Sequence, residues 1–482
     1  MDSSNSQQLP ITPTQIAKNE SLSSTENQIN KANSDPAQGT QLPSYQMNKN
    51  LFQNNQQQIS PFLLNFLYQN MNNNQNNFNF NSQGSFNMNN GNALINAFTT
   101  FFNYHNQRLI LSQQNYTADT LKSEYEALKR IDHDNPQKIK DNLNKFENNI
   151  LLPFYININQ AVSSKRAMYT ETFNKYKTAI TKVLKNLNLE ETTTVNAYGS
   201  IMNNFLIEDG DIDICIVPEI LIEDFSIHLK EIQNEITSSG IGTYQLSHIS
   251  PRYSLLKVID NDTGLTVDIT VHTKLPLRNT RLIRTYSLYD QRFHLMGIYI
   301  KNWAKRNKLN GATDKYLSSY ALLVMIIHFL QSEVHPSVLP ILQKVQNETQ
   351  NYTYSHTGEE FTTNLYFEED MDKVKEYMKV INNNEENTMT ATELIVKFFE
   401  FYAYKYEHKY LISISSGEQK TASSEHIAFP IEDPFDIEHN PGKSMKLNTQ
   451  QYELFMNCMK KEINMLLSGE YVSALSVQGN SE

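Results

Sequence analysis

Three acidic residues have the types and spacing of ligands for a divalent cation. Asp211 and Asp213 lie in the run Asp-Ile-Asp-Ile, so in a strand both carboxylates point to one face. Asp268 lies in a second β-branched run that could pair beside the first. Neighbouring carboxylates repel one another unless a cation joins them, and Mg²⁺ prefers oxygen ligands. Three carboxylates could hold two cations about 3.5–4 Å apart, as an in-line phosphoryl displacement requires.

A Gly-Ser pair precedes these acids. Gly199 would let backbone N–H groups approach a triphosphate, and the Gly199-Ser200 turn precedes an expected short helix whose N-terminus favours negative charge. An acid pair or a Gly-Ser pair alone has little specificity. The acids also resemble the start of an EF-hand, but Ile214 and Ile220 occupy its required glycine and bidentate-acid positions, which excludes that alternative. The combination of all these features is what points to phosphoryl chemistry.

The elements that must position these residues change in type along the chain. Apolar periodicity and capping residues predict helices at 120–131, 136–149, 164–187, 316–331 and 391–406. Runs rich in β-branched residues predict strands at 193–198, 212–217, 254–259 and 265–272. We also expect a hairpin around 415–417 and a surface excursion in the acidic stretch 348–387. This order predicts an α+β fold, with a small mixed sheet set into a mostly helical domain.

The N-terminal region, 1–115, is predicted to be a disordered Asn/Gln-rich tail. Between 68 and 91, 11 of 24 residues are Asn, so there is little apolar surface to offset the entropy of ordering. Two interpretations stay open for this tail: an inert segment, or one that self-associates or binds a partner.

Charge and cysteine content limit the class of protein. The 482 residues carry a net charge of −11, which argues against a globally basic nucleic-acid coat protein. The segment 278–315 nevertheless holds nine basic and two acidic residues, a local +7 suited to a triphosphate and an RNA 3′ end. Two cysteines exclude a disulfide framework and a four-cysteine zinc site. We find no secretory signal, and the apolar stretch 321–330 is too short to span a bilayer, so no membrane association is expected.

Together these features resemble the polymerase-β-type nucleotidyltransferases. Further stretches in the order of that family narrow the resemblance to the template-independent RNA terminal transferases, a group of terminal uridylyltransferases and poly(A) polymerase relatives. The matching stretches are 279–282, 300–305, 317–320, 398–404 and 431–440.

The resemblance implies a role for each matching residue. Asp211, Asp213 and Asp268 would be catalytic and bind Mg²⁺ or Mn²⁺, and Asp268 would help to deprotonate the RNA 3′-hydroxyl. Nucleotide binding would involve Gly199, Ser200, Asn279, Thr280, Lys301, Lys305, Ser319, Tyr320, Asp433, Asp436 and His439. From the residues alone, Lys301 and Lys305 could equally be a solvated helix face, and Tyr320 could be a core aromatic.

The resemblance also implies a preferred base. The segment 433–442 resembles the uridylyltransferase form of the nucleotide-recognition loop, in which a histidine at the position of His439 contacts uracil and crowds out purines. We therefore expect UMP transfer from UTP to an RNA 3′ end. A poly(A)-adding enzyme and a catalytically silent scaffold or RNA-binding subunit stay open. Asn204 and Gly210 depart from the family, which usually has glycine and serine there, and both departures touch the phosphate loop.

The resemblance divides the chain into regions beyond the tail. N-terminal helices are expected at 116–170, the catalytic domain at 171–275, a helical poly(A)-polymerase-associated domain at 276–470 and a flexible end at 471–482. No recognisable RNA-binding module accompanies them, so we expect a protein partner, from RNA-silencing or RNA-decay machinery, to supply RNA choice. We expect a cytoplasmic location, with RNA granules as one site and the nucleus still open.

Overall fold

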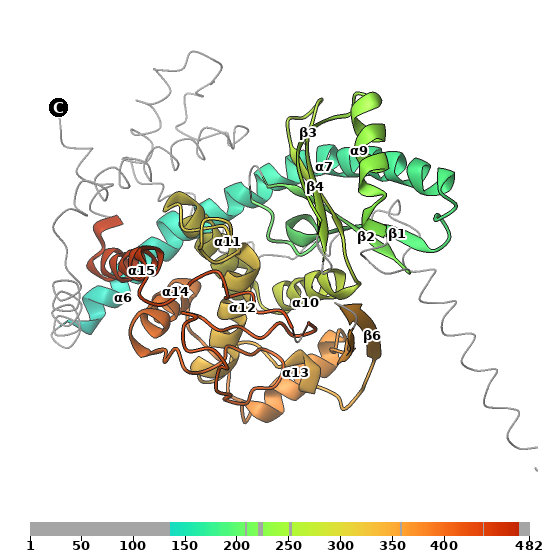
Figure 1. Ribbon diagram of the computed structural model, residues 1–482. Coiled ribbons are helices and arrows are strands. Elements are labelled where there is room, and N and C mark those ends of the chain that lie inside the picture. Colours follow the sequence, from blue (N-terminus) through green and yellow to red (C-terminus); the bar gives the residue numbers. More distant parts are fainter. Residues whose placement is uncertain are drawn as a thin grey trace, which may run out of the picture. The chain divides into compact units, whose positions relative to one another are not determined.

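The computed structural model describes residues 135–471 except 208–209, 220–224, 250–252, 357–358 and 437 (Figure 1). The expected tail at 1–115, the helix expected at 120–131 and the end from 472 onward lie outside these residues. The described chain contains a five-stranded sheet and many helices, so the expected α+β class is confirmed. None of the described helices is both long and apolar enough to cross a membrane.

Two helices precede the sheet. Helix α6, Pro136–Phe146, begins where expected, because Asn135 accepts a hydrogen bond from Lys138 N at 3.1 Å and proline fits the first turn. A π-helical turn, Glu147–Leu151, leads into α7, Leu152–Asn186. The start expected at 164 was wrong. The preceding turns contain helix-neutral Asn and Ile residues, and burial of Phe154, Tyr155 and Ile158 on one side stabilises them in spite of weak propensity.

The sheet has the strand order β1-β2-β5-β4-β3, with β2 and β5 parallel and the other neighbours antiparallel. Its strands are β1 Thr193–Tyr198, β2 Ile212–Pro218, β3 Gly242–His248, β4 Ser254–Asp260 and β5 Thr266–Val271. The four expected strands are confirmed. Strand β3 was missed because it is an edge strand in which Gly242 is buried and the other residues are exposed, which removes the alternation that marks a half-buried strand.

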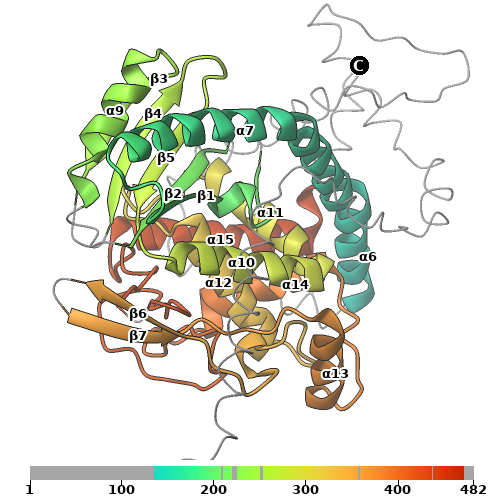
Figure 2. The ribbon, with the colours of Figure 1, turned by 90° about the vertical axis from the view of Figure 1, so that its right-hand side faces the viewer.

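The two faces of the sheet have different chemistry. Ile212, Ile214 and Ile216 pack with residues of β4, β5, α7 and α9, Leu229–Ser238, in one apolar cluster. Figure 2 shows α7 and α9 on this side of the strands. Since side chains alternate along a strand, Asp213 points to the opposite face.

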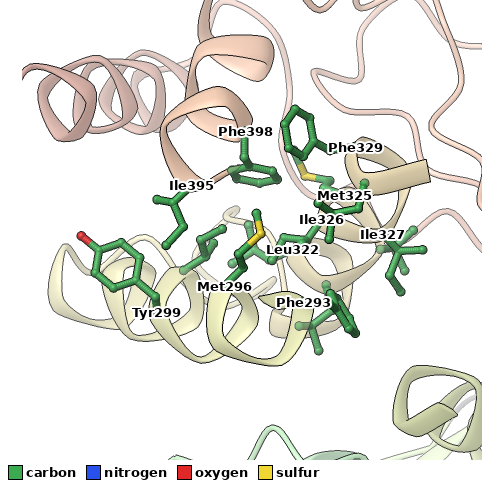
Figure 3. Packing of buried hydrophobic residues seen from close by; sticks show 14 of the residues in the cluster. Phe293, Met296, Tyr299, Leu322, Met325, Ile326, Ile327, Phe329, Ile395 and Phe398 are labelled. Carbon is green, nitrogen blue, oxygen red and sulfur yellow. The ribbon is translucent and has the colours of Figure 1, made fainter. Parts of the chain in front are cut away.

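A second apolar cluster joins the helices that follow the sheet. They are α10 Leu275–Tyr289, α11 Gln291–Arg306, α12 Ser319–His328, α13 Met371–Ile381, α14 Ala391–Glu400 and α15 Gln450–Ser468. Figure 3 shows Met296 of α11, Leu322 of α12 and Ile395 of α14 in this cluster. Helix α12 is shorter than the expected 316–331: Ser318 caps it by accepting from Ala321 N at 3.1 Å, and a π-helical turn, Phe329–Glu333, follows it.

The acidic stretch 348–387, expected as a surface excursion, contains regular secondary structure. It contains a hairpin of β6, Asn351–His356, and β7, Glu359–Asn364, followed by α13. The hairpin expected around 415–417 is a reversal at Gly417, with φ +62°, closed by an isolated bridge between Tyr410 and Thr421. That expectation was therefore wrong in detail, because no paired strands extend the reversal.

Candidate active site

The parallel pairing of β2 and β5 brings the acidic residues together. Asp213 is in register with Asp268, and Tyr198 of β1 is in register with Asp213 on the other side. Asp211 directly precedes β2. The two half-buried carboxylates therefore lie side by side on the face away from the sheet's apolar cluster, as the sequence predicted.

These carboxylates carry more negative charge than their surroundings neutralise. Burial foremost, and then the charges of Asp268 and Asp211, raise the pKa of Asp213 to about 7, although Lys301 and the Ser200 backbone N–H act in the opposite direction. Burial also raises the pKa of Asp268, although Lys257 Nζ lies 3.0 Å from its Oδ1. A divalent cation would relieve this repulsion, and an all-carboxylate donor set suits a hard ion. Among the described residues, no three His, Cys, Asp or Glu side chains form a ready-made metal cluster.

The loop after β1 approaches these carboxylates closely. Gly199 has φ +68°, and a Cβ at this position would lie 2.1 Å from Asp213 Oδ2. A 3-10 turn, Gly199–Ile201, takes the place of the expected short helix, and Ser200 lies in it. Gly199 N donates to Thr280 Oγ1 of α10 at 3.1 Å, so α10 holds the start of the loop. Glycine is required here both for backbone conformation and for space.

The two departures from the family pattern have structural explanations. Asn204 has φ +72°, a region that glycine and asparagine tolerate, and its Nδ2 donates to Ser287 Oγ at 3.0 Å. Asparagine thus adopts the backbone conformation for which glycine is the usual choice. At Gly210, a Cβ would lie 2.3 Å from Leu206 Cδ1, so a serine would require Leu206 to move.

Lys301 and Lys305 of α11 differ in environment. Lys301 Nζ donates to Phe205 O at 2.9 Å, and burial lowers the pKa of Lys301 to about 8 against the attraction of Asp213. Lys305 is exposed one helical turn later. Lys301 therefore holds the loop 199–205 after β1, here called the phosphate-side loop, in addition to the phosphate contact expected for it. Ser319 is half-buried at the start of α12.

Asp433 is the common acceptor of a polar cluster, here called the cradle, whose side-chain donors are Asn279, Tyr320 and His439. Its buried carboxylate accepts from Asn279 Nδ2 at 3.0 and 3.1 Å, from the Tyr320 hydroxyl at 3.2 Å and from His439 Nδ1 at 3.0 Å. The backbone N–H groups of Phe435 and Asp436 donate to it at 3.1 Å. Burial opposes ionisation, yet the donors, His439 foremost, lower the pKa of Asp433. An ionised acceptor thus joins α10, α12 and the recognition loop.

The cradle leaves one buried acceptor facing no donor. Because Asp433 can only accept, it orients the Asn279 amide with its N–H₂ towards the carboxylate. Asn279 Oδ1 is buried without a hydrogen-bond partner among the described residues. A buried carbonyl without a donor is costly, so this atom suits a ligand hydroxyl, in agreement with the ribose contact expected for Asn279.

Comparisons with known proteins agree with this geometry. Residues 157–288 match the family model of the central palm domain of mitochondrial-like poly(A) RNA polymerase. Human terminal uridylyltransferase 4 is 31% identical over 283 residues, which cover 56% of this chain and 17% of that protein. Poly(A) RNA polymerase gld-2 homolog A of Drosophila melanogaster is 28% identical over 223 residues, covering 45% and 15%. This chain thus matches less than a fifth of the length of either relative.

A solved structure has the same fold. The RNA terminal uridylyl transferase Cid1 aligns with a TM-score of 0.51 and 19% identity, over 63% of this chain and 88% of that one. In its palm region and in its fold, the chain is thus similar to the polymerase-β-type terminal nucleotidyltransferases.

Asp436 lies within the recognition loop, 433–442, next to the β6–β7 hairpin. It is buried, and its Oδ1 accepts from the Tyr354 hydroxyl at 3.1 Å and from Glu438 N at 3.2 Å. Asp436, expected to bind nucleotide, thus braces the loop against the β6–β7 hairpin. Sequence reasoning missed Tyr354, and no local signal marks it, because its partner lies 82 residues away.

Several arginines of the segment 278–315, here called the basic strip, form ion pairs within the described chain. Arg278 and Arg281 both form ion pairs with Glu369, at 2.8 and 2.6 Å, and Arg292 pairs with Asp290 at 2.7 Å. Much of the positive charge therefore stabilises contacts between helices and loops. The local +7 charge of 278–315, expected to suit a triphosphate and an RNA 3′ end, is therefore offset in part by these ion pairs.

Proposed function

We propose that this chain is a template-independent RNA 3′-terminal uridylyltransferase. The RNA 3′-hydroxyl oxygen would attack the α-phosphorus of UTP, forming a phosphodiester bond while the bond to the β-phosphate breaks and pyrophosphate leaves. The observation that carries the choice of uridine is the hydrogen bond between His439 and Asp433 in a cradle shared with Asn279 and Tyr320.

The carboxylate face would perform the chemistry. Asp211, Asp213 and Asp268 would hold two Mg²⁺ or Mn²⁺ ions, which would supply positive charge to the attacking and leaving oxygens. Asp268 would take the proton from the 3′-hydroxyl. Gly199, Ser200, Lys301, Lys305 and Ser319 would contact the triphosphate. The close approach of the Gly199 backbone to Asp213 supports this arrangement, because it brings backbone N–H groups next to the carboxylates.

The hydrogen bond to Asp433 restricts what His439 can offer a base. Asp433 is an acceptor, so Nδ1 of His439 carries a proton, and Nε2 of a ring that carries only this proton is an acceptor. At the centre of its Watson–Crick edge, uracil offers the N3–H donor, whereas adenine offers the N1 acceptor. Binding of a base whose N3–H is paired should be favoured over binding of one whose N1 stays unpaired by about 1–3 kcal/mol, roughly a 5- to 150-fold preference. We therefore expect uridine to be favoured by a finite factor.

Adenylation is the second candidate, because the relatives include poly(A) polymerases. The four nucleotides, each supplied separately with Mg²⁺ or Mn²⁺ and a labelled RNA primer, separate the alternatives. Predominant extension with UTP supports the proposal, and predominant extension with ATP identifies an adenylating enzyme. Absence of extension with every nucleotide and both ions favours the scaffold alternative. An Asp211→Asn, Asp213→Asn protein is the control and should extend nothing.

We further propose that a cytoplasmic protein partner supplies RNA choice. In support, the arginines of the basic strip are largely engaged within the described chain. The purified enzyme should extend a mixed set of RNAs with little preference. Strong selection of one RNA by the purified enzyme would contradict this proposal.

A further inference from the structure

One stripe of α11 holds the phosphate-side loop. His294, Gly297 and Lys301 are three and four residues apart, so they share a helix face. His294 Nε2 lies 2.6 Å from Asn204 O, and Lys301 Nζ donates to Phe205 O at 2.9 Å. Gly297 leaves room for the Phe205 ring, since a Cβ there would lie 2.2 Å from Phe205 Cε1. Two consecutive carbonyls of the loop are therefore bound by two side chains of one helix.

This end of the loop is coupled to the end that meets the carboxylates. Asn203 N donates to Gly199 O at 3.0 Å, and Phe205 N donates to Asn203 Oδ1 at 2.9 Å. Asn204, between them, has a left-handed backbone that asparagine adopts less readily than glycine. Movement of the peptide after Asn204 would therefore be transmitted to Gly199.

The tautomer of His294 follows from its two partners. Asn204 O can only accept, so Nε2 of His294 carries the proton. Nδ1 then has a lone pair, which accepts from the Tyr155 hydroxyl at 2.6 Å. The two rings meet edge to face, with centroids 5.3 Å apart. Burial lowers the pKa of His294 and raises that of Tyr155, so the neutral forms that this arrangement needs are favoured.

We propose that His294 is a positioning residue for nucleotide binding. Held by Tyr155 of α7 as the Nε2–H tautomer, it fixes the peptide after Asn204 and so keeps the loop from Gly199 in the shape that receives the triphosphate. The identity of the ligand rests on the proposed function. Through the contact between Tyr155 and His294, helix α7, which precedes the sheet in sequence, helps to hold the nucleotide site.

Three substitutions separate the two hydrogen bonds of His294. His294→Phe keeps a ring against Phe205 and removes both nitrogens, whereas His294→Gln keeps an N–H close to the position of Nε2. Tyr155→Phe removes only the hydroxyl. The matched control is Tyr299→Phe on the same helix, whose hydroxyl donates to Glu462, away from the loop.

We expect His294→Phe to raise KM for UTP about tenfold, the usual effect of losing one buried hydrogen bond, while KM for the RNA primer stays unchanged. His294→Gln should restore most of the loss, and Tyr155→Phe should show a smaller rise. Tyr299→Phe should lower the melting temperature and leave KM for UTP unchanged. An unchanged KM for UTP in His294→Phe, or an equal rise in Tyr299→Phe, would overturn the proposal.

Hydrogen exchange without nucleotide tests the loop directly. The amides of 199–205 should exchange faster in His294→Phe than in the wild type and should be unaffected by Tyr299→Phe. If His294→Phe does not fold, Tyr155→Phe and His294→Gln decide: faster exchange in the former with near-normal exchange in the latter supports the role, and identical behaviour of both contradicts it. A wild type that adds no nucleotide would refute the proposed function, and the exchange result would still decide the role of His294.

Discussion

Asn279 and Asp433 lie 154 residues apart in sequence, and the Asn279 amide nitrogen contacts both carboxylate oxygens of Asp433 at 3.0 and 3.1 Å. This pair connects α10 to the recognition loop. It also decides the direction of the Asn279 amide, since only its N–H₂ can face an ionised carboxylate. The opposite atom, Oδ1, is a buried acceptor without a partner among the described residues, and we propose that a ribose hydroxyl donates to it.

Replacing Asn279 should therefore weaken discrimination for the sugar. Asn279→Leu preserves the volume but removes both the donor to Asp433 and the acceptor for the hydroxyl. We expect KM for UTP to rise roughly 5- to 150-fold, from the loss of about 1–3 kcal/mol, and 2′-deoxy-UTP to be affected less. Steady-state kinetics with the two nucleotides measures this. Equal effects on both would show that Asn279 does not contact the 2′-hydroxyl.

His439→Leu should shift incorporation from uridine towards adenosine. The substitution removes the acceptor Nε2 and leaves Asp433 with its remaining donors from Asn279 and Tyr320. The ratio of UTP to ATP incorporation, measured with both nucleotides in competition, should fall by about tenfold or more. A ratio equal to that of the wild type would show that His439 does not select the base.

Gly199→Ala should abolish extension, whereas Gly240→Ala should not. Both glycines are left-handed, with φ +68° and +71°, so each substitution costs about 1–2 kcal/mol of backbone strain. Only at Gly199 would the methyl group meet Asp213 Oδ2, at 2.1 Å, while the space around Gly240 is open. Extension assays with thermal melting distinguish the two effects. Comparable activity in both variants would contradict the proposal that extension needs the close approach of Gly199 to Asp213.

The carboxylate face should be stabilised by metal. Because Asp213 and Asp268 lie side by side in register, Mg²⁺ should raise the melting temperature of the wild type, and chelation should abolish extension until Mg²⁺ or Mn²⁺ is restored. Asp213→Asn removes one of the repelling charges. Its metal-free melting temperature should be higher than that of the wild type, with little further rise on adding Mg²⁺. Melting curves with and without Mg²⁺ measure both shifts, and a lower metal-free value would contradict the repulsion argued here.

Acid stability should depend on Asp260. Asp260 is the buried last residue of β4, forms an ion pair with Lys175, and accepts from Thr263 N and Oγ1 at 2.9 and 2.7 Å. Burial opposes its ionisation, but Lys175 and Thr263 lower the pKa of Asp260 below its ordinary value. Its contribution to the free energy of unfolding is therefore complete above the ordinary pKa of about 3.9 and is lost as pH falls through the folded value.

We accordingly expect Asp260→Asn to destabilise the protein by about 1–3 kcal/mol near pH 7, with the difference from the wild type shrinking below about pH 4. Denaturant unfolding across this range measures the difference. Lys182→Met is the control, because Lys182 is exposed and its ion pair with Glu235 should contribute less than about 1 kcal/mol. A difference that stays constant at all pH values would rule out ionised Asp260 as the cause.

The sequence by itself was sufficient for what depends on neighbours along the chain. The period-two runs around Asp211, Asp213 and Asp268 predicted strands with the carboxylates on one face. The pairing of β2 with β5 confirms this for Asp213 and Asp268, whereas Asp211 lies one residue before β2. Prediction from the sequence failed where burial overrides weak helix propensity, as at the start of α7. It also failed where an exposed edge strand, β3, lacks the alternation of apolar and polar residues.

Only the tertiary structure decided which side chains share hydrogen bonds across long separations. Tyr354 meets Asp436, His294 meets Asn204, and Glu369 takes up the charge of Arg278 and Arg281. Each partner lies 80 or more residues away, so no local pattern encodes the contact. A buried polar group must be satisfied by whatever atom the packing of helices and sheet brings within reach, and that is a property of the folded chain as a whole.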